Sequence, residues 1–340
     1  MKRYELTSSQ KLIYQSEKTI GKESSLITGI TIIKGEDNIE KLELAAKEVL
    51  GCIDAMRIKI CETSEGPKQI FLDSCEELVE RIDFNNTKEM EEYIGKYNEI
   101  DIEGRLYKLI VSKVGGNSLG IIGIIHHIIS DAWSMLLIVN NILDYYYDDF
   151  CKDSMFMYSD YIIQNKEYLS SKSFERSLQY WKSKIKEIGE ADPVYTKRSL
   201  CYDSIRTYFK INKALSEKIN NFAAKSKCSP YSLFMSALAI YINRNNNVSN
   251  FYIGTSVLNR VNRKEKNTFG MFVNTIPLNF YFNDKVTFLE VLTSTAKEIR
   301  LGFRHQRCNY GKILEEANCS KGLFDIVLSF QNASLEEKYK

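Results

Sequence analysis

The sequence contains little histidine and little proline. Its 340 residues include three histidines, four prolines and 17 glycines. So few prolines and glycines exclude a collagen-like chain or one made mainly of linkers, and no long polar tract suggests disorder. Lysine plus arginine (46) nearly balances aspartate plus glutamate (44), a charge pattern that does not indicate a nucleic-acid binder.

The cysteines form no CxxC pair. They stand at positions 52, 61, 75, 151, 201, 228, 308 and 319. This scatter favours buried free thiols over a disulfide framework or a zinc site. His305 and Cys308 are three residues apart and could share a helix face, but no second pair completes a metal site, so we expect no metal.

The chain also lacks membrane and export signals. The first 18 residues contain no apolar stretch of the kind found in signal peptides. The most apolar run, residues 119–129, is interrupted by two histidines and is too short to span a bilayer. We therefore expect a cytoplasmic protein with neither nucleic acid nor membrane as a partner.

The first half of the sequence alternates strand and helix patterns. Strands are expected at 26–34 and 56–61, with 69–73 pairing with the latter, and helices after a cap at Asp37 or Asn38 and at 86–97. Residues 105–113 and 118–125 read as a hairpin with glycines in the turn. Its second strand is apolar on both faces, which is typical of a central strand. A helix follows at 132–148, capped by Ser130 or Asp131.

The second half mixes the same elements. We expect one or two amphipathic helices over 158–186, a connection over 189–199, helices at 215–226 and 286–303, and another opening at Ser229–Pro230. Strands are expected at 251–257, 271–282 and 323–330. The length fits two lobes, so the sequence predicts an α/β fold, an α+β sandwich built twice.

Two of the three histidines, His126 and His127, are adjacent at the end of the apolar strand. Successive strand residues point to opposite faces, so one imidazole should face a cleft and the other the body of the fold. A lone histidine beside apolar residues is usually a satisfied core residue, but strand ends that open into loops often carry catalytic groups. Asp131 could orient an imidazole or hold the turn through a salt bridge or a cap.

A histidine with an ordinary pKa suits general-base work on an amine or hydroxyl. The sequence has no G-x-S-x-G elbow, Walker loop, HExxH or GxGxxG motif. The predicted chemistry is therefore transfer between bound substrates, without an enzyme-borne nucleophile or cofactor.

Several motifs resemble those of one known family. HHIISDA at 126–132 resembles the HHxxxDG motif of the condensation domains of nonribosomal peptide synthetases, which are relatives of chloramphenicol acetyltransferase. Further resemblances follow in the family's order and cover nearly the whole chain. They are LTSSQKLIY at 6–14, Ala55-Met56-Arg57, YSDYIIQ at 158–164, GTSVLNR at 254–260, FGMFVNTIPLNF at 269–280, His305-Gln306 and LFDIVLSFQN at 323–332.

The resemblance implies two acetyltransferase-like lobes in a V-shaped pseudo-dimer, with a tunnel between them. The N-terminal lobe would be 1–187 and carry the HHxxxD motif, and the C-terminal lobe would be 188–340. Carrier proteins would bring an acyl or peptidyl donor and an aminoacyl acceptor as thioesters on phosphopantetheine arms, with adenylation domains adjacent. The acceptor amine would attack the donor thioester and form an amide, with no cofactor bound by this chain.

The resemblance also implies roles for individual residues. His127 would be the base or amine-positioning group, and His126 the inward-facing structural histidine. Asp131 would hold the motif by an ion pair, with Arg260 across the lobes as its partner and Arg57 as the runner-up. The remaining supporting or tunnel-lining residues would be Ala132, Trp133, Ser134 and Asn274.

The sequence departs from the family pattern at several points. The motif glycine is Ala132, which keeps the backbone N–H but adds a methyl group where the donor arm would approach. Residues 51–54 replace the usual RHE, and Gln164 stands where an aromatic is usual. The family continues beyond the last motif, so we expect the second lobe to be incomplete. Two other functions stay open: a free-standing acyltransferase that uses a soluble amine or alcohol, and a non-catalytic module that docks carriers or partners.

Overall fold

The computed structural model of the chain describes residues 2–21, 25–73, 79–97, 100–152, 155–189, 191–195, 205–283, 285–319, 322–331 and 335. Cys75, Cys201 and residues 190 and 196–199 of the expected connection lie outside this set. The described elements combine helices with three short sheets, which confirms the predicted α/β class. None of the helices in these ranges combines the length and apolar character needed to cross a bilayer.

The chain divides into two compact units. Unit 1 comprises Met1–Leu169, Arg260–Val273 and Asn332–Lys340, and unit 2 comprises Ser170–Asn259 and Asn274–Gln331. Arg260–Val273, the crossing segment, therefore belongs to unit 1 although it lies late in the sequence. The two lobes expected at 1–187 and 188–340 stay a prediction.

Unit 1 carries most of the strands. In chain order its elements are β1 (Arg3–Glu5), α1 (Ser8–Ile20), β2 (Leu26–Lys34), α2 (Ile39–Cys52), the 3₁₀ helix η2 (Asp54–Arg57), β3 (Ile58–Thr63), β4 (Gly66–Phe71), β5 (Val79–Arg81), α3 (Thr87–Lys96), β6 (Tyr107–Lys113), β7 (Ser118–His126), α4 (Ala132–Tyr146), α5 (Tyr158–Leu169) and α9 (Arg263–Lys266).

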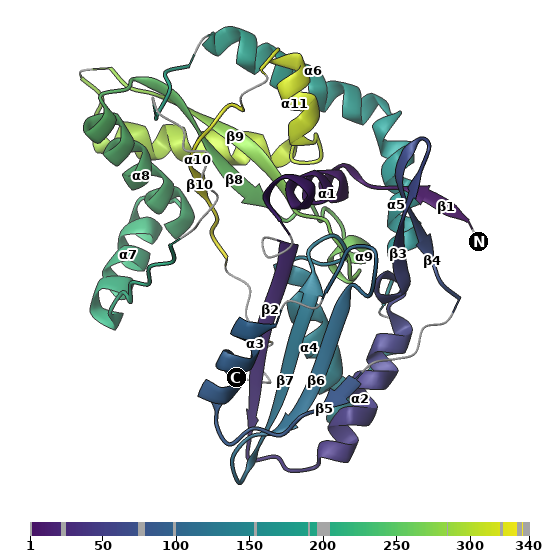
Figure 1. Cartoon of the computed structure of the whole chain (residues 1–340). Helices are drawn as coiled ribbons and strands as arrows, with labels where there is room; N and C mark the ends of the chain where they lie inside the picture. The colour runs from purple at the N-terminus through teal and green to yellow at the C-terminus, as the bar shows by residue number, and fades with distance from the viewer. Residues whose placement is uncertain are drawn as a thin grey trace. The chain divides into compact units, whose positions relative to one another are not determined.

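The main sheet of unit 1 has the strand order β2-β7-β6-β5 (Figure 1). The predicted hairpin is confirmed, because β6 and β7 pair antiparallel and Gly115 in their turn has φ 60°. β7 lies between β2 and β6 and is buried from Leu119 onward, as its apolar sequence predicts. A second sheet, β1-β4-β3, confirms the predicted pairing of the segments 56–61 and 69–73. The first strand begins at Ile58, because Asp54–Arg57 form η2.

Side chains of β7 alternate between two apolar layers. Ile121 and Ile125 join the core that includes α2 and α4, whereas Ile122 and Ile124 pack with Met90 of α3 on the other face. This period of two follows from strand geometry, because successive side chains point to opposite faces. The strand then ends at His126, so the apolar layers fix the position from which the next residues leave the sheet.

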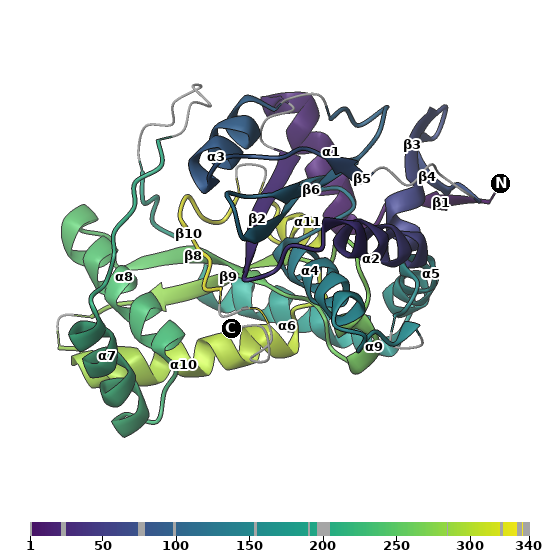
Figure 2. The ribbon, with the colours of Figure 1, turned by 90° about the horizontal axis from the view of Figure 1, so that it is seen from below.

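Unit 2 contains the remaining elements. They are α6 (Lys172–Ile188), α7 (Lys213–Lys225), α8 (Pro230–Asn246), β8 (Asn250–Val257), β9 (Asn274–Tyr281), α10 (Phe288–Arg304), α11 (Tyr310–Glu316) and β10 (Val327–Leu328). Its sheet has the order β10-β8-β9, with α10 against β9 and beside α8 (Figure 2). Ser229 caps α8 and Pro230 is its first residue, as predicted.

Two predicted strands of unit 2 are shorter than expected. The strand predicted at 271–282 begins at Asn274, because the residues before it belong to the crossing segment and so are part of unit 1. The strand predicted at 323–330 is reduced to Val327–Leu328, which pairs parallel with β8. In both segments the apolar sequence is longer than the stretch that is hydrogen-bonded to a neighbouring strand.

Candidate active site

The turn between β7 and α4 brings the histidine pair and Asp131 together in unit 1. The backbone N–H of His126 donates to the Leu106 carbonyl at 2.7 Å, and that of His127 donates to the Ser25 carbonyl at 2.6 Å. Residues 127–130 then turn, with the N–H of Ile129 donating to the His126 carbonyl at 3.1 Å. The chain enters α4 directly after this turn, with Asp131 as its N-cap.

His126 is a buried, fully bonded imidazole. The backbone N–H of Ile128 donates to its Nδ1 at 3.0 Å, so the ring proton is on Nε2. Nε2 lies 2.5 Å from Oε2 of Glu17 on α1 and donates to it. Burial lowers the pKa of His126 below its ordinary value, although the Glu17 carboxylate opposes this effect. Both ring nitrogens are thus hydrogen-bonded. Because its pKa is lowered, the ring is neutral at pH 7.

His127 is half-buried and holds the opposite tautomer. Its Nδ1 lies 2.8 Å from the backbone carbonyl oxygen of Ser130. A carbonyl oxygen only accepts hydrogen bonds, so Nδ1 carries the proton and donates it. In the neutral ring the lone pair is then on Nε2, which is the arrangement that a general base requires.

Asp131 is fully buried and its carboxylate is saturated with hydrogen bonds. It accepts from the backbone N–H of Ser134 at 2.8 Å and from that of Phe272 at 3.1 Å. Nη2 of Arg260 lies 3.0 and 3.1 Å from its two oxygens. These donors hold the carboxylate away from proton transfer, so Asp131 serves as a cap and an ion-pair partner.

Arg260 connects Asp131 to the crossing segment. Its Nη1 donates to the carbonyl oxygens of Glu265 and Thr268 at 2.6 and 2.5 Å. Its guanidinium carbon lies 3.8 Å from the centre of the Phe272 ring. Because Arg260–Val273 belongs to unit 1, this ion pair is internal to that unit.

The first turn of α4 is also bound to the crossing segment. The hydroxyl of Ser134 donates to the Gly270 carbonyl at 2.8 Å and accepts from the Gly270 N–H at 3.0 Å. Nε1 of Trp133 donates to the Lys266 carbonyl at 2.8 Å. Ala132 is exposed at the first helical position. Its backbone N–H, like that of Trp133, has no acceptor within the helix, because the first N–H groups of a helix never do.

Two residues predicted for the site lie outside this network. Arg57 donates from Nε to the Leu72 carbonyl at 3.2 Å and from Nη1 to the Gly51 carbonyl at 3.1 Å. Asn274 belongs to unit 2, where its Nδ2 donates to the carbonyls of Gln306 and Cys308, both at 2.8 Å. Its Oδ1 is buried without a partner among the described residues.

Sequence reasoning missed two residues that contact the motif. Glu17 binds His126, and Gln10 donates from Nε2 to the Ile128 carbonyl at 3.0 Å. Both come from α1, which hydrophobic periodicity does not reveal because its buried residues are polar: Ser9, Gln10 and Glu17. The signal that could have found this helix is its capping box, formed by Thr7 and Gln10.

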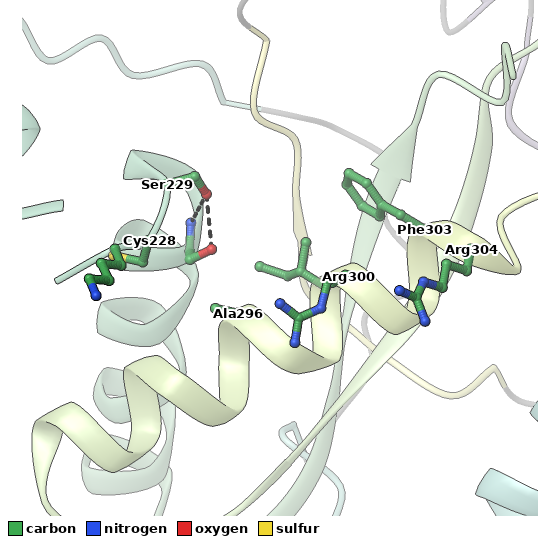
Figure 3. Close-up of a pocket in the computed structure, with 9 residues that line it drawn as sticks. Cys228, Ser229, Ala296, Arg300, Phe303 and Arg304 are labelled. Atoms are coloured by element: carbon green, nitrogen blue, oxygen red, sulfur yellow. Dashed lines mark hydrogen bonds between the residues drawn. The ribbon is translucent and has the colours of Figure 1, made fainter. Parts of the chain in front are cut away.

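A separate cavity lies in unit 2, between the start of α8 and the end of α10 (Figure 3). It has a volume of about 490 Å³ and is lined in part by Ser229, Phe303 and two arginines four residues apart, Arg300 and Arg304. None of the residues that the sequence predicts for the site is among its lining residues.

Comparisons with known proteins point to one family. A model of the family described as condensation domain matches residues 1–340. Surfactin synthase subunit 1 of Bacillus subtilis (strain 168) is 26% identical over 352 residues, which cover 96% of this chain and 10% of that protein. The chain therefore spans only a small part of this curated relative.

Solved structures show the same fold. The condensation domain from the monacolin K polyketide synthase MokA aligns with a TM-score of 0.82 and 20% identity over 97% of this chain and 78% of that one. The first condensation domain of the calcium-dependent antibiotic synthetase, solved with a substrate analogue, gives 0.81 and 15% over 96% and 80%. The predicted fold is thereby confirmed, while the expected incompleteness of the second lobe stays a prediction.

Proposed function

The chain belongs to the condensation-domain family, and on this premise we propose that it forms amide bonds between two carrier-bound substrates in nonribosomal peptide biosynthesis. The donor is an acyl or peptidyl thioester and the acceptor is an aminoacyl thioester. Both arrive on phosphopantetheine arms of carrier proteins, and this chain holds no cofactor of its own. Adenylation domains of the same synthetase lie adjacent, and the reaction takes place in the cytoplasm.

The reaction moves a single proton, in two transfers, and needs no covalent enzyme intermediate. The acceptor amine attacks the donor thioester carbonyl, a new C–N bond forms, and the C–S bond breaks. The proton that the amine loses passes to Nε2 of His127 and then to the departing thiolate. Most of the rate enhancement comes from holding the two substrates in register, because an oriented pair reacts as a single molecule.

The observation that carries this proposal is the contact between Nδ1 of His127 and the backbone carbonyl oxygen of Ser130. The Ser130 carbonyl accepts the Nδ1 proton at 2.8 Å and leaves the Nε2 lone pair for a substrate proton. His126 offers no such nitrogen, because Ile128 and Glu17 occupy both of its ring atoms. Only the second histidine of the motif therefore suits the base role.

The start of α4 supports the same reaction. Negative charge develops on the thioester oxygen during attack, and the positive end of a helix favours such charge. The backbone N–H groups of Ala132 and Trp133 lie at this end of α4. We assign them to the developing oxyanion, with Ala132 keeping the N–H that the motif glycine supplies in the family.

A transfer assay with the wild-type chain separates the candidate functions. A panel of acyl-loaded donor carriers is combined with aminoacyl-loaded acceptor carriers, and amide product is followed by mass spectrometry. Product that requires both carriers supports the proposal. Product from a soluble amine or alcohol without an acceptor carrier replaces it with a free-standing acyltransferase, and carrier binding without any transfer replaces it with a docking module.

A further inference from the structure

Helix α1 fixes the residue on each side of His127. Gln10 donates to the carbonyl of Ile128, and Glu17 accepts from the ring of His126, whose other nitrogen accepts the Ile128 N–H. The N–H and the C=O of Ile128 are thus both held by α1, one directly and one through His126. Gln10 and Glu17 are seven residues apart, two turns of the helix, and so lie on the same face.

Glu17 is a costly residue in this position. It is 7% exposed, and its partner is the neutral ring of His126. Burying a carboxylate without a cation is unfavourable, because the charge loses its hydration and no opposite charge compensates for it. The carboxylate therefore needs a reason other than stability, and its contact with the residue before His127 provides one.

We propose that Glu17 is a positioning residue for His127, and this assignment rests on the amide-forming function proposed above. Its carboxylate accepts the Nε2 proton of His126 and so keeps Nδ1 of that ring as the acceptor for the Ile128 N–H. The tautomer of His126 thereby sets the backbone of the turn over 127–130. That backbone carries the Ser130 carbonyl. This carbonyl accepts the Nδ1 proton of His127 and so fixes the tautomer of that ring.

According to the proposal, the position of His127 depends on an acceptor oxygen at the right distance from the backbone of residue 17. It does not depend on the negative charge of that residue. Glu17→Gln keeps an oxygen acceptor at the same distance from the backbone. Glu17→Asp keeps the charge but withdraws the acceptor by one methylene group. Glu17→Leu removes the acceptor, and Gln15→Leu, on the exposed side of α1, is the matched control.

Two readouts test these variants in the full chain. The first is long-range ¹H–¹⁵N NMR of the imidazoles, which is simple to assign because the chain has three histidines. The second is single-turnover transfer, with the rate separated from the KM for each loaded carrier. A residue that merely stabilises the fold would not change the tautomer of His127 or alter the rate while leaving KM unchanged.

We expect Glu17→Gln and Gln15→Leu to keep the Nδ1–H form of His127 and a near-normal rate. Glu17→Asp and Glu17→Leu should give mixed tautomers and lower the rate on the order of 10- to 100-fold with unchanged KM, since small misplacements of a reacting group have effects of this size. If Glu17→Leu does not fold, the comparison of Glu17→Gln with Glu17→Asp carries the test.

Two results would overturn the assignment. One is an unchanged His127 tautomer in both Glu17→Asp and Glu17→Leu. The other is an equal loss in Glu17→Gln and Glu17→Asp, which would mean that the exact carboxylate matters. The NMR result stands without any transfer activity, so failure of the proposed function and failure of the positioning role are distinguishable.

Discussion

At the scale of single residues, the two adjacent histidines differ because of what each nitrogen meets. An N–H donates to Nδ1 of His126, whereas a carbonyl oxygen accepts from Nδ1 of His127. The two rings therefore take opposite tautomers, although they are neighbours in the chain. Both nitrogens of His126 are used in hydrogen bonds that hold the turn, whereas His127 keeps a lone pair on Nε2.

The burial of His126 predicts a pH dependence of stability. Its folded pKa is lowered, mainly by burial, so the unfolded chain binds more protons once the pH falls below the ordinary value of about 6.5. The contribution of His126 to the free energy of unfolding should be constant above that pH and decrease below it, by at most about 1.4 kcal/mol per pH unit, until the lowered pKa is reached. Urea denaturation between pH 8 and 5 measures this slope.

The control for this prediction is His126→Gln. Burial also lowers the pKa of His305, so the difference between wild type and His126→Gln isolates the contribution of His126. Equal slopes for the two proteins would contradict the assignment of a neutral, buried His126.

The Asp131–Arg260 pair predicts strong coupling in stability. Both side chains are fully buried, and removing one partner of a buried pair typically costs about 3–5 kcal/mol because the other charge is left unpaired. Asp131→Asn and Arg260→Met should each destabilise the chain, and the double variant should lose less than the sum. Denaturant titration of the four proteins gives the coupling energy.

Arg263→Met is the matched control for this cycle. Arg263 is exposed on α9, three residues after Arg260, so its replacement should change stability by less than about 0.5 kcal/mol. Additive effects of Asp131→Asn and Arg260→Met would mean that the two residues do not form a coupled pair.

At the scale of elements, the crossing segment Arg260–Val273 completes the site. It supplies Arg260 and the Phe272 N–H to Asp131, and Gly270 to Ser134. The hydroxyl of Tyr158 on α5 also donates to the Met271 carbonyl at 2.8 Å. The turn over residues 127–130 is thus held by α1, and the N-cap that follows it is held by a segment more than 100 residues away in the chain.

Gly270 predicts a steric test of this arrangement. A Cβ atom at Gly270 would lie 2.1 Å from Cδ2 of Tyr158, too close for any real contact. Gly270→Ala should displace the segment, destabilise the chain by about 1–3 kcal/mol and lower the transfer rate. Gly116→Ala is the control, since a Cβ there meets nothing within 4 Å. Equal stability of the two variants in urea would show that the segment does not pack as described.

Much of this architecture could be predicted from the sequence. The hairpin of β6 and β7, the helix after Asp131 and the Ser229–Pro230 start of α8 follow from local signals: turn glycines, apolar periodicity and caps. Helix α1 could not be found by apolar periodicity, because its buried face is polar. The late start of the predicted strand, at Asn274, has a tertiary cause, since the backbone N–H of Phe272 binds Asp131 instead of a neighbouring strand.

The residue types of the candidate site could be proposed from the sequence, but the contacts between them could not. Adjacent histidines at the end of an apolar strand indicate a cleft residue and a body residue without any structure. The partner of His126 could not be inferred, because Glu17 is 109 residues away and no local pattern links the two. Long-range polar contacts of this kind depend on the folded arrangement of elements.

At the scale of the whole molecule, the two compact units are not continuous in the sequence. Arg260–Val273 packs within unit 1, while the residues on each side of it, Asn259 and Asn274, belong to unit 2. Asp131, the N-cap of α4, therefore takes its buried ion-pair partner, Arg260, from the second half of the sequence. The contacts around the histidine turn therefore join residues from both halves of the sequence.

The central claim is that His127 accepts the proton of the attacking amine. The most direct test is the single-turnover rate of amide formation from two loaded carriers by His127→Ala, compared with wild type and with His305→Gln. His305 belongs to unit 2, stacked on Tyr180, and serves as the histidine control. We predict that His127→Ala lowers the rate by about 10²–10⁴-fold, the usual contribution of a general base, while His305→Gln stays near wild type. A near-normal rate for His127→Ala would contradict the base role.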